Sequence, residues 1–401
     1  MITISVPTHA SAKLYVYCRS NVIIPIVKNK KGDVTDGDNY RPIAITSVAS
    51  KILELLMLER FSLYLVTTDN QFGFKNGVST ELCIFSLKQT IDYYKSMSSP
   101  VYVCFMDASK AFDRINHCLL FNKLIIRGVP LIAVRLLCNW YSTQIFHIQW
   151  GSVLSQGFSV TNGVRQGGIM SPILFNVYID DLSKELSNMK IGCHFNDVNV
   201  NHLVYADDTV LLAPSPSALQ KLINCCVNFA GSNDIFYNFK KTKCMCIRPK
   251  GLKDLYFPKL YLEDKVITCV EKEKYLGCFI TDDLSDDDDD DLQRQMCSIY
   301  ARGNVLIRNF KNCTPDIKIL LFKTYCTGFY GSATWSNYKR KSYNKLRVAF
   351  NNIFRTLMGI SRLESMSRHM LDSKVDNFRI VMRKYMVNLI KRIEDSKNSI
   401  V

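Results

Sequence analysis

Residues 101–107, with the sequence VYVCFMD, form an apolar run that ends in an aspartate. Asp107 shares one face of this segment with Phe105 and Val103, because successive side chains of a strand point to opposite sides. The small-residue segment DASKAF follows, and we expect the chain to turn there into a helix. The pattern therefore predicts a strand that carries one carboxylate at its end.

A second apolar stretch, HLVYADDTVLLA at residues 202–213, is interrupted by two adjacent aspartates. The flanking apolar residues predict a strand, a tight turn and a second strand, with Asp207 and Asp208 at the turn. Aspartate suits turns because its side chain bonds nearby backbone, so a plain hairpin with a polar tip is the simplest interpretation. Adjacent carboxylates repel each other, however, unless a cation or a basic group lies between them. The pair therefore also indicates a site that attracts positive charge.

Other patterns predict helices and one further strand. NVIIPIV, near the N-terminus, predicts a strand. In residues 47–65 the apolar positions recur at helical spacing; they include Ile52, Leu55 and Leu56, in line with Glu59. Ser47 or Ser50 is expected to cap this helix. SPILFNVYIDDLSKEL predicts another helix, with Ser171 as its N-cap and Pro172 at its first position.

Positive charge is concentrated in the last quarter of the chain. The whole chain carries 51 Lys and Arg and 36 Asp and Glu, a formal net charge of +15, and residues 292–401 hold 21 basic and 6 acidic residues. The preceding 291 residues are therefore neutral overall, and the acidic run DDLSDDDDDDL before the basic segment is expected to be a solvated linker. The basic segment has helical patterns in which Lys and Arg are interleaved with Tyr and Phe. Such a segment suits contact with a nucleic acid, with rings inward and charges outward, although a basic solvated surface has the same composition.

The remaining composition narrows the class of protein. A hydrophobic content of 47% in 401 residues supports a packed core, and 11% aromatic residues argue against disorder. Fifteen scattered cysteines form no C-x-x-C pairs, and their odd number without a signal peptide indicates a reducing compartment. Cys193, His194 and His202 come nearest to a metal set, but partly buried ordinary residues are the simpler interpretation. No apolar run approaches the about 18 residues of a membrane span.

Asp107 becomes more informative beside Asp207 and Asp208. If their strands are neighbours in a sheet, three carboxylates meet at one end of it. Such a group binds hard divalent ions, which take oxygen ligands. Two ions about 3.5–4 Å apart stabilise the attacking and leaving oxygens of a phosphoryl displacement. The sequence therefore predicts a two-metal site for phosphoryl transfer.

Several segments occur in the order and spacing of the reverse transcriptase domain of non-LTR (LINE-type) retrotransposons, which residues 20–285 resemble. They are NYRPIAITSVASKILE, QFGFKNGVST, FMDASKAFDRI, GVRQGGIMSPILFNVYIDDL, YADDTVLL, FKKTKCM and KYLGCFI. The resemblance implies an α+β fold of the right-hand polymerase type, with fingers, a palm built on an antiparallel sheet, and a helical thumb. We expect fingers at 1–100, the palm at 101–285 with a fingers-proximal segment around 120–170, and the basic thumb and C-terminal helices at 286–401.

The resemblance implies an RNA-directed DNA polymerase, in which a primer 3′-OH attacks the α-phosphate of a dNTP and pyrophosphate leaves. Asp107, Asp207 and Asp208, with the backbone carbonyl of Ala108, would hold two Mg²⁺ ions, Mn²⁺ being an alternative. One ion would lower the pKa of the attacking hydroxyl, and the other would neutralise charge on the pyrophosphate. The other acids of these segments are expected to be structural or solvent-facing; they are Asp113, Asp180 and Asp181.

Phe112 lies five positions after Asp107, where the family places the side chain under the incoming sugar. A bulky ring there leaves no room and no hydrogen-bond partner for a 2′-OH, so the resemblance implies selection of deoxynucleotides. A core phenylalanine of the helix is the structural alternative.

Glycines and basic residues supply the other predicted contacts with the nucleotide. The resemblance implies that the loop GVRQGGIMSP packs against the nascent base pair, with Gln166 and Gly167 as its key positions. Arg41 and Lys28 are expected to neutralise the triphosphate. Lys241 is expected to protonate the leaving pyrophosphate. For the lysines the register stays open, with Lys30 and Lys31 as alternatives to the first, and Lys240 and Lys243 to the second.

The resemblance also implies partners and a location. KYLGCFI would be a hairpin that grips the primer end. The expected partners are an RNA template, a DNA primer or nicked chromosomal target, and dNTPs, with no membrane. Action in the nucleus, with a cytoplasmic ribonucleoprotein stage, would follow from the family's chromosomal target.

Two alternatives remain open at this stage. One is a decayed nucleic-acid-binding relic that keeps the fold without the activity. The other is a group II intron maturase or telomerase-like reverse transcriptase, although neither a maturase segment nor a telomerase-type RNA-binding domain is visible. The upstream endonuclease and the C-terminal zinc knuckle usual in the family are not found either, so we expect a truncated or decayed element copy, a gene-model fragment, or one domain of a longer protein.

Overall fold

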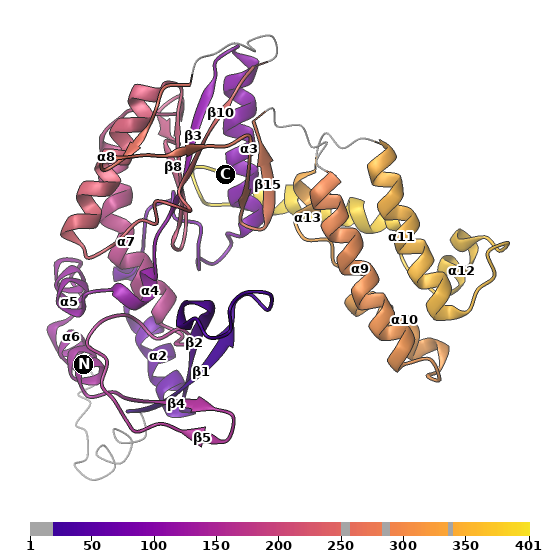
Figure 1. Ribbon diagram of the computed structural model, residues 1–401, viewed down its shortest axis with the longest axis horizontal. Helices are drawn as coiled ribbons and strands as arrows, with labels where there is room; N and C mark the ends of the chain where they lie inside the picture. The colour runs from indigo at the N-terminus through magenta and orange to yellow at the C-terminus, as the bar shows by residue number, and fades with distance from the viewer. Residues whose placement is uncertain (1–18, 250–256, 283–288, 336–339) are drawn as a thin grey trace. The chain divides into compact units, whose positions relative to one another are not determined.

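The computed structural model describes residues 19–249, 257–282, 289–335 and 340–401 (Figure 1). The chain forms two compact units. The first consists of Met1–Lys75, Cys104–Thr242 and Lys259–Ile267, and the second of Asn76–Val103, Lys243–Pro258 and Thr268–Val401. The predicted limits of fingers, palm and thumb stay predictions. Most of the acidic run predicted to be a linker, residues 283–288, lies outside the described residues.

A four-stranded sheet of order β2-β1-β4-β5 belongs to the first unit. Its strands are β1 (Ser20–Val27), β2 (Tyr40–Thr46), β4 (Ile145–Trp150) and β5 (Val153–Leu154), and a short 3₁₀ helix, η1 (Gly37–Asn39), precedes β2. β1 pairs antiparallel with β2 and parallel with β4. The β-branched residues of NVIIPIV favour this extended backbone, and the predicted strand is confirmed.

α2 (Val48–Phe61) confirms the helix predicted after β2, and the 3₁₀ helix η2 (Ser62–Tyr64) follows it. Ser47 is the N-cap, since its side chain accepts a hydrogen bond from the backbone N–H of Ser50. The helix turns an unexpected face inward. Its buried residues are Ser50, Glu54 and Met57, whereas Ile52, Leu55 and Leu56 are each more than half exposed. Hydrophobic spacing thus identifies the helix but not its buried face, because Glu54 forms an ion pair with Arg165 inside the unit.

A central strand and a hairpin form the other main feature of the first unit. The end of β3 (Val101–Asp107) lies beside β9 (Asp208–Ala213), and β9 lies beside β8 (His202–Tyr205). β8 and β9 pair antiparallel and are joined by a two-residue loop. The predicted strand and the predicted hairpin are therefore confirmed. Nearly all residues of the three strands are buried, which accounts for their apolar sequences.

Helices of the first unit pack against this hairpin and against one another (Figure 1). They are α4 (Ala111–Arg114), α5 (His117–Ile126), α6 (Leu131–Ser142), α7 (Ser171–Asn188) and α8 (Pro216–Ser232). α8 packs against β9 and α7, α7 packs against α5, and α5 against α6. Two short hairpins complete the unit; they are β6–β7 (His194–Phe195 and Val198–Asn199) and β11–β12 (Tyr261–Leu262 and Lys265–Val266).

Ser171 is not the N-cap of α7, and this prediction is wrong. Met170 occupies the cap position with helical backbone angles of −76° and −25°, and Ser171 is the first helical residue. The loop before the helix is already tightly turned, since the N–H of Gly168 donates to the carbonyl of Arg165 at 3.1 Å. Helical geometry therefore begins one residue earlier than the sequence indicates, and the Ser171 side chain is buried.

The second unit combines short strands with long helices. Its strands are the start of β3, then β10 (Lys243–Ile247), β13 (Thr268–Cys269), β14 (Lys272–Tyr275) and β15 (Cys278–Thr281). Its helices are α3 (Thr80–Ser96), α9 (Asp289–Asn309), α10 (Pro315–Tyr325), η3 (Ser332–Thr334), α11 (Arg340–Met358), α12 (Met366–Asp372) and α13 (Phe378–Glu394). β14 and β15 form the hairpin predicted from KYLGCFI. Its two-residue loop has positive φ at both Leu276 and Gly277, the geometry that fits the twist of a hairpin.

The C-terminal helices enclose an aromatic core. Five buried phenylalanines of this core contact one another in pairs; they are Phe322, Phe329, Phe350, Phe354 and Phe378. Lys341 and Lys345 of α11 are exposed, as are Arg379 and Arg383 of α13. The expected arrangement of rings inward and charges outward is confirmed. Within the described ranges, no helix has both the length and the hydrophobicity needed to cross a lipid bilayer.

Candidate active site

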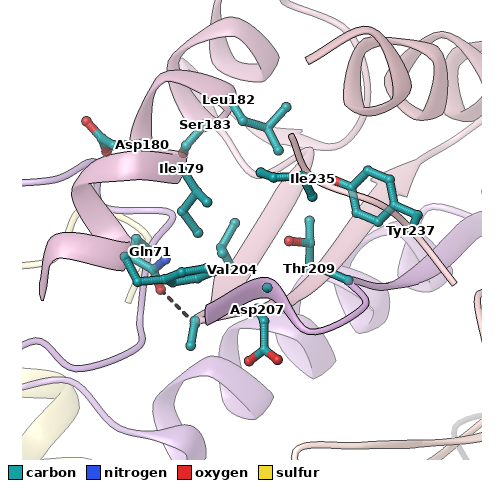
Figure 2. A pocket seen from close by; sticks show the side chains of 14 residues that line it. Gln71, Ile179, Asp180, Leu182, Ser183, Val204, Asp207, Thr209, Ile235 and Tyr237 are labelled. Atoms are coloured by element: carbon teal, nitrogen blue, oxygen red, sulfur yellow. Dashed lines mark hydrogen bonds between the residues drawn. The ribbon is translucent and has the colours of Figure 1, made fainter. Parts of the chain in front are cut away.

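Three carboxylates gather at one end of the β3-β9-β8 strands. Asp107 ends β3, Asp207 lies in the loop of the β8–β9 hairpin, and Asp208 begins β9 opposite Tyr205. Because β3 and β9 are neighbours, residues a hundred positions apart in the sequence meet at one edge. In Figure 2 the carboxyl group of Asp207 points away from the apolar side chains of Ile179 and Val204.

Burial and neighbouring negative charge make carboxyl groups at this edge harder to ionise. Burial raises the pKa of all three, and the charge of Asp107 raises the pKa of the other two further. The pKa of Asp208 reaches about 6, because the adjacent Asp207 adds to burial. Lys241 lowers each of these pKa values, and Arg41 lowers that of Asp207, but neither reverses the shift. Uncompensated carboxylates of this kind attract a hard cation with oxygen ligands.

The fit to a divalent ion rests on this chemistry rather than on a closed ligand set. Among the residues that the structure describes, no three His, Cys, Asp or Glu side chains converge as a preformed metal site. The donors are all oxygen atoms, and burial together with the negative charges of Asp207 and Asp107 raises the pKa of Asp208. Such an open, acidic edge suits ions that share their coordination with a substrate.

The basic residues predicted to act at this site differ in how close they lie to the three carboxylates. The Nζ of Lys241 lies 3.7 Å from Oδ2 of Asp107. Lys241 of the segment FKKTKCM is therefore close to the carboxylates. Arg41 is in β2 and is close enough to Asp207 to affect its pKa. Lys28, which directly follows β1, donates from Nζ to the backbone carbonyl of Asp38 at 2.9 Å. The structure thus brings Lys241 and Arg41 to the acidic edge, and the choice among Lys28 and its neighbours stays open.

A segment far away in the sequence holds the hairpin in place. Residues 70–73 run beside β8: the N–H of Phe72 donates to the carbonyl of Val204 at 2.7 Å, and the N–H of Val204 donates to the carbonyl of Asn70 at 2.8 Å. The side-chain oxygen of Gln71 accepts from the N–H of Ala206 at 3.2 Å, the bond drawn in Figure 2. It also accepts from the N–H of Gly73 at 2.8 Å. These bonds fix the loop that carries Asp207.

Ala206 and Gly73 show how tightly this contact is made. Ala206 has φ of +57°, a left-handed conformation that is unfavourable for a residue with a Cβ atom. A Cβ atom on Gly73 would lie 2.5 Å from the backbone nitrogen of Ala206, so only glycine fits there. Asn176 of α7 donates to the carbonyl of Gly73 at 2.7 Å and anchors the segment from behind. Sequence reasoning noted QFGFKNGVST only as a segment and missed this supporting role.

Behind the hairpin lies a small, mainly apolar cavity of about 20 Å³. Gln71, Phe175, Ile179, Val204 and Asp207 are among its lining residues (Figure 2). A space of this size holds about one water molecule. It is therefore too small to hold a nucleotide.

Phe112 lies on α4, just after the strand that ends in Asp107. Its ring stacks on the buried ring of Phe175, with centroids 4.4 Å apart and an interplanar angle of 11°. Phe74, which is half exposed, contacts the ring of Phe112 edge-on, with the two centroids 6.4 Å apart. Phe112 is only partly buried, so its ring is both fixed and accessible. Phe74 and Phe175 are aromatic neighbours that the sequence patterns did not reveal.

The glycine-rich loop is anchored to β2 and to α4. The N–H of Ala44 donates to the carbonyl of Gln166 at 2.7 Å, and a Cβ atom on Gly167, whose φ is +121°, would lie 2.6 Å from the carbonyl oxygen of Ala44. The side chain of Gln166 donates to Oδ1 of Asp113 at 2.9 Å. Asp113 thus has the structural role expected of it, and the loop is held against both elements.

A buried ion pair supports the same loop from inside. Arg165 pairs with Glu54 of α2, both are almost fully buried, and the guanidinium lies over the ring of Trp140 at 4.5 Å. Glu54 also accepts from the N–H of Ile169 at 2.5 Å. Removing one partner of such a pair would leave an uncompensated buried charge. Glu54 was not singled out in the sequence, because a glutamate in an amphipathic helix is ordinarily solvated.

The two acids of α7 have structural partners. Asp180 is buried and accepts from Arg127 at 2.5 Å and from the N–H of Thr68 at 2.7 Å. For Asp181, burial raises the pKa, but hydrogen bonds and charge from Lys123 and Lys184 outweigh it and the net pKa is lowered.

His202 is held inside the first unit. Its Nε2 contacts Oγ of Ser183 at 2.6 Å and its Nδ1 contacts Oδ1 of Asn201 at 2.6 Å. Burial lowers its pKa to about 3. Both ring nitrogens thus have protein partners, whereas His194 lies in an exposed position of β6.

Comparison with known proteins supplies the wider context of this site. A family profile described as "Reverse transcriptase (RNA-dependent DNA polymerase)" matches residues 28–280. The chain is 28% identical over 217 residues to the "Retrovirus-related Pol polyprotein from type-2 retrotransposable element R2DM" of Drosophila melanogaster, covering 53% of this chain and 20% of that protein. It is 24% identical over 391 residues to the "RNA-directed DNA polymerase from mobile element jockey" of the same species, covering 92% of this chain and 41% of that protein. The chain thus spans less than half the length of these curated relatives.

Among solved structures, the apo telomerase of Candida tropicalis matches with a TM-score of 0.51 and 14% sequence identity, over 94% of this chain and 62% of that one. At this identity the similarity concerns the fold alone. The α+β right-hand polymerase fold predicted from the sequence is confirmed by it.

Replacing Gly73 by alanine is expected to destabilise the first unit by about 1–3 kcal/mol, the usual cost of forcing extra atoms into a packed contact. The new Cβ would have to displace the backbone of Ala206. Urea unfolding of the purified chain measures the change. Gly231→Ala is the matched control, because nothing lies within 4 Å of its Cβ position in α8 and alanine favours helices. Equal stability of the two variants would contradict the proposed close contact.

Asp208→Asn is expected to stabilise the metal-free protein at pH 8 more than at pH 4. The folded-state pKa of about 6 lies above the ordinary value of 3.8, so ionisation opposes folding once the pH rises through this range. At pH 4 the folded carboxyl group is protonated and most of the difference disappears. Unfolding midpoints measured in EDTA at both pH values test this. Asp197→Asn, which changes an exposed aspartate between β6 and β7, is the control.

Proposed function

The chain belongs to the reverse transcriptase family, and on this premise we propose that it is the RNA-directed DNA polymerase segment of a non-LTR retrotransposon. One observation carries the proposal: Asp107 lies on a strand next to the hairpin that bears Asp207 and Asp208. The proposed reaction joins the 3′-OH of a primer to the α-phosphate of a dNTP, with release of pyrophosphate.

The acidic edge is where this chain would hold divalent ions. Asp107, Asp207, Asp208 and the backbone carbonyl of Ala108 would bind two Mg²⁺ ions, with Mn²⁺ as a substitute. When bound, the ions supply activation of the attacking hydroxyl and neutralisation of the leaving pyrophosphate. The raised pKa of Asp208, to which burial and the charges of Asp207 and Asp107 contribute, supports this assignment.

The basic side chains are proposed to act on the triphosphate. Lys241, within 3.7 Å of Asp107, would donate a proton to the departing pyrophosphate. Arg41 would neutralise phosphate charge, since it lies near Asp207. Lys28 is the second candidate for that role. Fixed positive charges aimed at developing negative charge stabilise such a transition state.

The remaining contacts would position the nucleotide. Phe112, fixed between Phe175 and Phe74, would lie under the sugar and exclude a 2′-OH. Gln166 and Gly167 would pack against the nascent base pair, in the loop that Glu54 and Arg165 hold in place.

The partners proposed are an RNA template, a DNA primer or nicked chromosomal target, and dNTPs. The exposed basic residues of α11 and α13 in the second unit are suited to phosphate contacts. The β14–β15 hairpin is proposed to contact the primer end. We also propose action in the nucleus, preceded by a ribonucleoprotein stage in the cytoplasm.

Primer extension tests the proposed activity. Purified protein with poly(rA)/oligo(dT), Mg²⁺ and dTTP is expected to extend the primer. Asp207→Asn should lower the rate by about 100-fold or more, as when one electrostatic group is removed from a catalytic site. Asp197→Asn, which changes an exposed aspartate outside the acidic edge, should retain activity. Tight RNA binding without any dTTP incorporation by the unchanged chain would favour a decayed relic instead.

Phe112→Ala is expected to relax sugar discrimination by roughly 10- to 200-fold, the range for a steric change in a substrate pocket. The removed ring opens space for a 2′-OH above Phe175. The ratio of kcat/KM for dTTP and UTP measures the change. Phe112→Tyr keeps the ring and serves as the control. A Phe112→Ala protein that excludes UTP as well as the parent would refute this role.

A further inference from the structure

Cys244 and Cys269 lie opposite each other on adjacent strands of the second unit. β10 and β13 pair in parallel, and Cys244 is the register partner of Cys269. The N–H of Val270 donates to the carbonyl of Cys244 at 2.9 Å, and the Sγ of Cys244 lies 3.6 Å from the carbonyl of Thr268. Adjacent strands are about 4.8 Å apart. That spacing falls within the Cα separation of about 4.4–6.8 Å that a disulfide requires.

The two thiols differ in access to solvent. Cys269 is exposed on the short strand β13, which is the outer strand of its sheet, whereas Cys244 is fully buried. A small oxidant in solution can therefore reach Cys269 first. Cys244 is placed to react only with a group that Cys269 already carries.

The surroundings also favour the reactive form of Cys269. A hydrogen bond from Cys244 and the charge of Arg248 lower the pKa of the Cys269 thiol to about 7, against the opposing effects of burial, Asp282 and Glu271. A substantial fraction is therefore thiolate at neutral pH, and the thiolate is the nucleophile in thiol oxidation.

We propose that Cys269 and Cys244 form a redox-active thiol pair, in which a hydroperoxide oxidises Cys269 and Cys244 then closes a disulfide. This site is separate from the polymerase chemistry and does not rest on the proposed function.

The two steps balance without another reactant. The Cys269 thiolate attacks one oxygen of the peroxide, an S–O bond forms, the O–O bond breaks, and the peroxide is reduced to water or an alcohol after taking a proton. The Cys244 thiol then attacks the sulfenic acid sulfur of Cys269. An S–S bond forms, the S–O bond breaks, and water leaves with the proton of Cys244. A thiol reductant restores both cysteines by exchange.

Cys246 is the closest competitor in this part of the chain. It lies two residues after Cys244 on the same face of β10, but burial raises the pKa of its thiol, and Tyr102 and Arg248 hydrogen-bond to it. Cys225 and Cys226 of α8 are adjacent in sequence, yet burial raises the pKa of both. The proposal is therefore specific for one pairing.

Peptide mapping after mild oxidation tests the proposal. The reduced full chain is treated with equimolar hydrogen peroxide at pH 7, alkylated, digested without reductant and analysed by mass spectrometry. The expected product links the peptides of Cys244 and Cys269 and disappears after dithiothreitol. Oxidation of Cys269 no faster than that of the exposed Cys118 and Cys297, or linkage of Cys269 to Cys246, would overturn the proposal.

Single serine variants separate the two steps. Cys244→Ser should let dimedone trap a sulfenic acid on Cys269, whereas Cys269→Ser should abolish both the adduct and the disulfide. Cys297→Ser, at an exposed position of α9, is the matched control and should leave the disulfide unchanged. A disulfide or a dimedone adduct that persists in Cys269→Ser would contradict the assigned order. Neither the disulfide nor the dimedone adduct depends on polymerase activity. A negative result in these experiments is therefore distinguishable from a failure of the proposed polymerase function.

Discussion

The rest of the first unit depends on one constraint, which is that three carboxylates are held close together at one edge. Burial raises the pKa of Asp107, Asp207 and Asp208, the charge of Asp107 raises it further for the other two, and the nearby Lys241 and Arg41 offset only part of the shift. A flexible backbone at this edge would relieve the repulsion, because the carboxylates could move apart. The buried strands β3, β8 and β9 prevent such movement, so the negative potential stays available for a cation.

The resistance to movement comes from contacts that are distant in sequence. Residues 70–73 extend the backbone hydrogen bonding of β8, and Gln71 fixes the loop at Ala206. Arg165 and Glu54 do the same for the glycine-rich loop from α2. The acidic edge and the glycine-rich loop are therefore both supported from the N-terminal segment of the unit, although the three carboxylates lie elsewhere in the chain.

Local patterns in the sequence were sufficient for the strand ending at Asp107, the hairpin of Asp207 and the aromatic core of the C-terminal helices. The differences concern the buried face of one helix and the start of another: α2 buries Glu54 in place of its leucines, and α7 begins at Ser171 itself, with Met170 in the cap position. Both depend on tertiary partners, Arg165 in one case and a tight preceding loop in the other. Likewise, no periodicity shows that Phe175 lies under Phe112.

The close approach of Gly73 to Ala206 has a consequence for protein engineering. The two segments are more than 130 residues apart, yet the left-handed backbone of one is accommodated only by the missing side chain of the other. A chimaera that imports the YADD hairpin from a related polymerase without residues 70–73 would combine surfaces that never co-adapted. Residues 70–73 and the YADD hairpin therefore have to be transferred together, although they are far apart in the sequence.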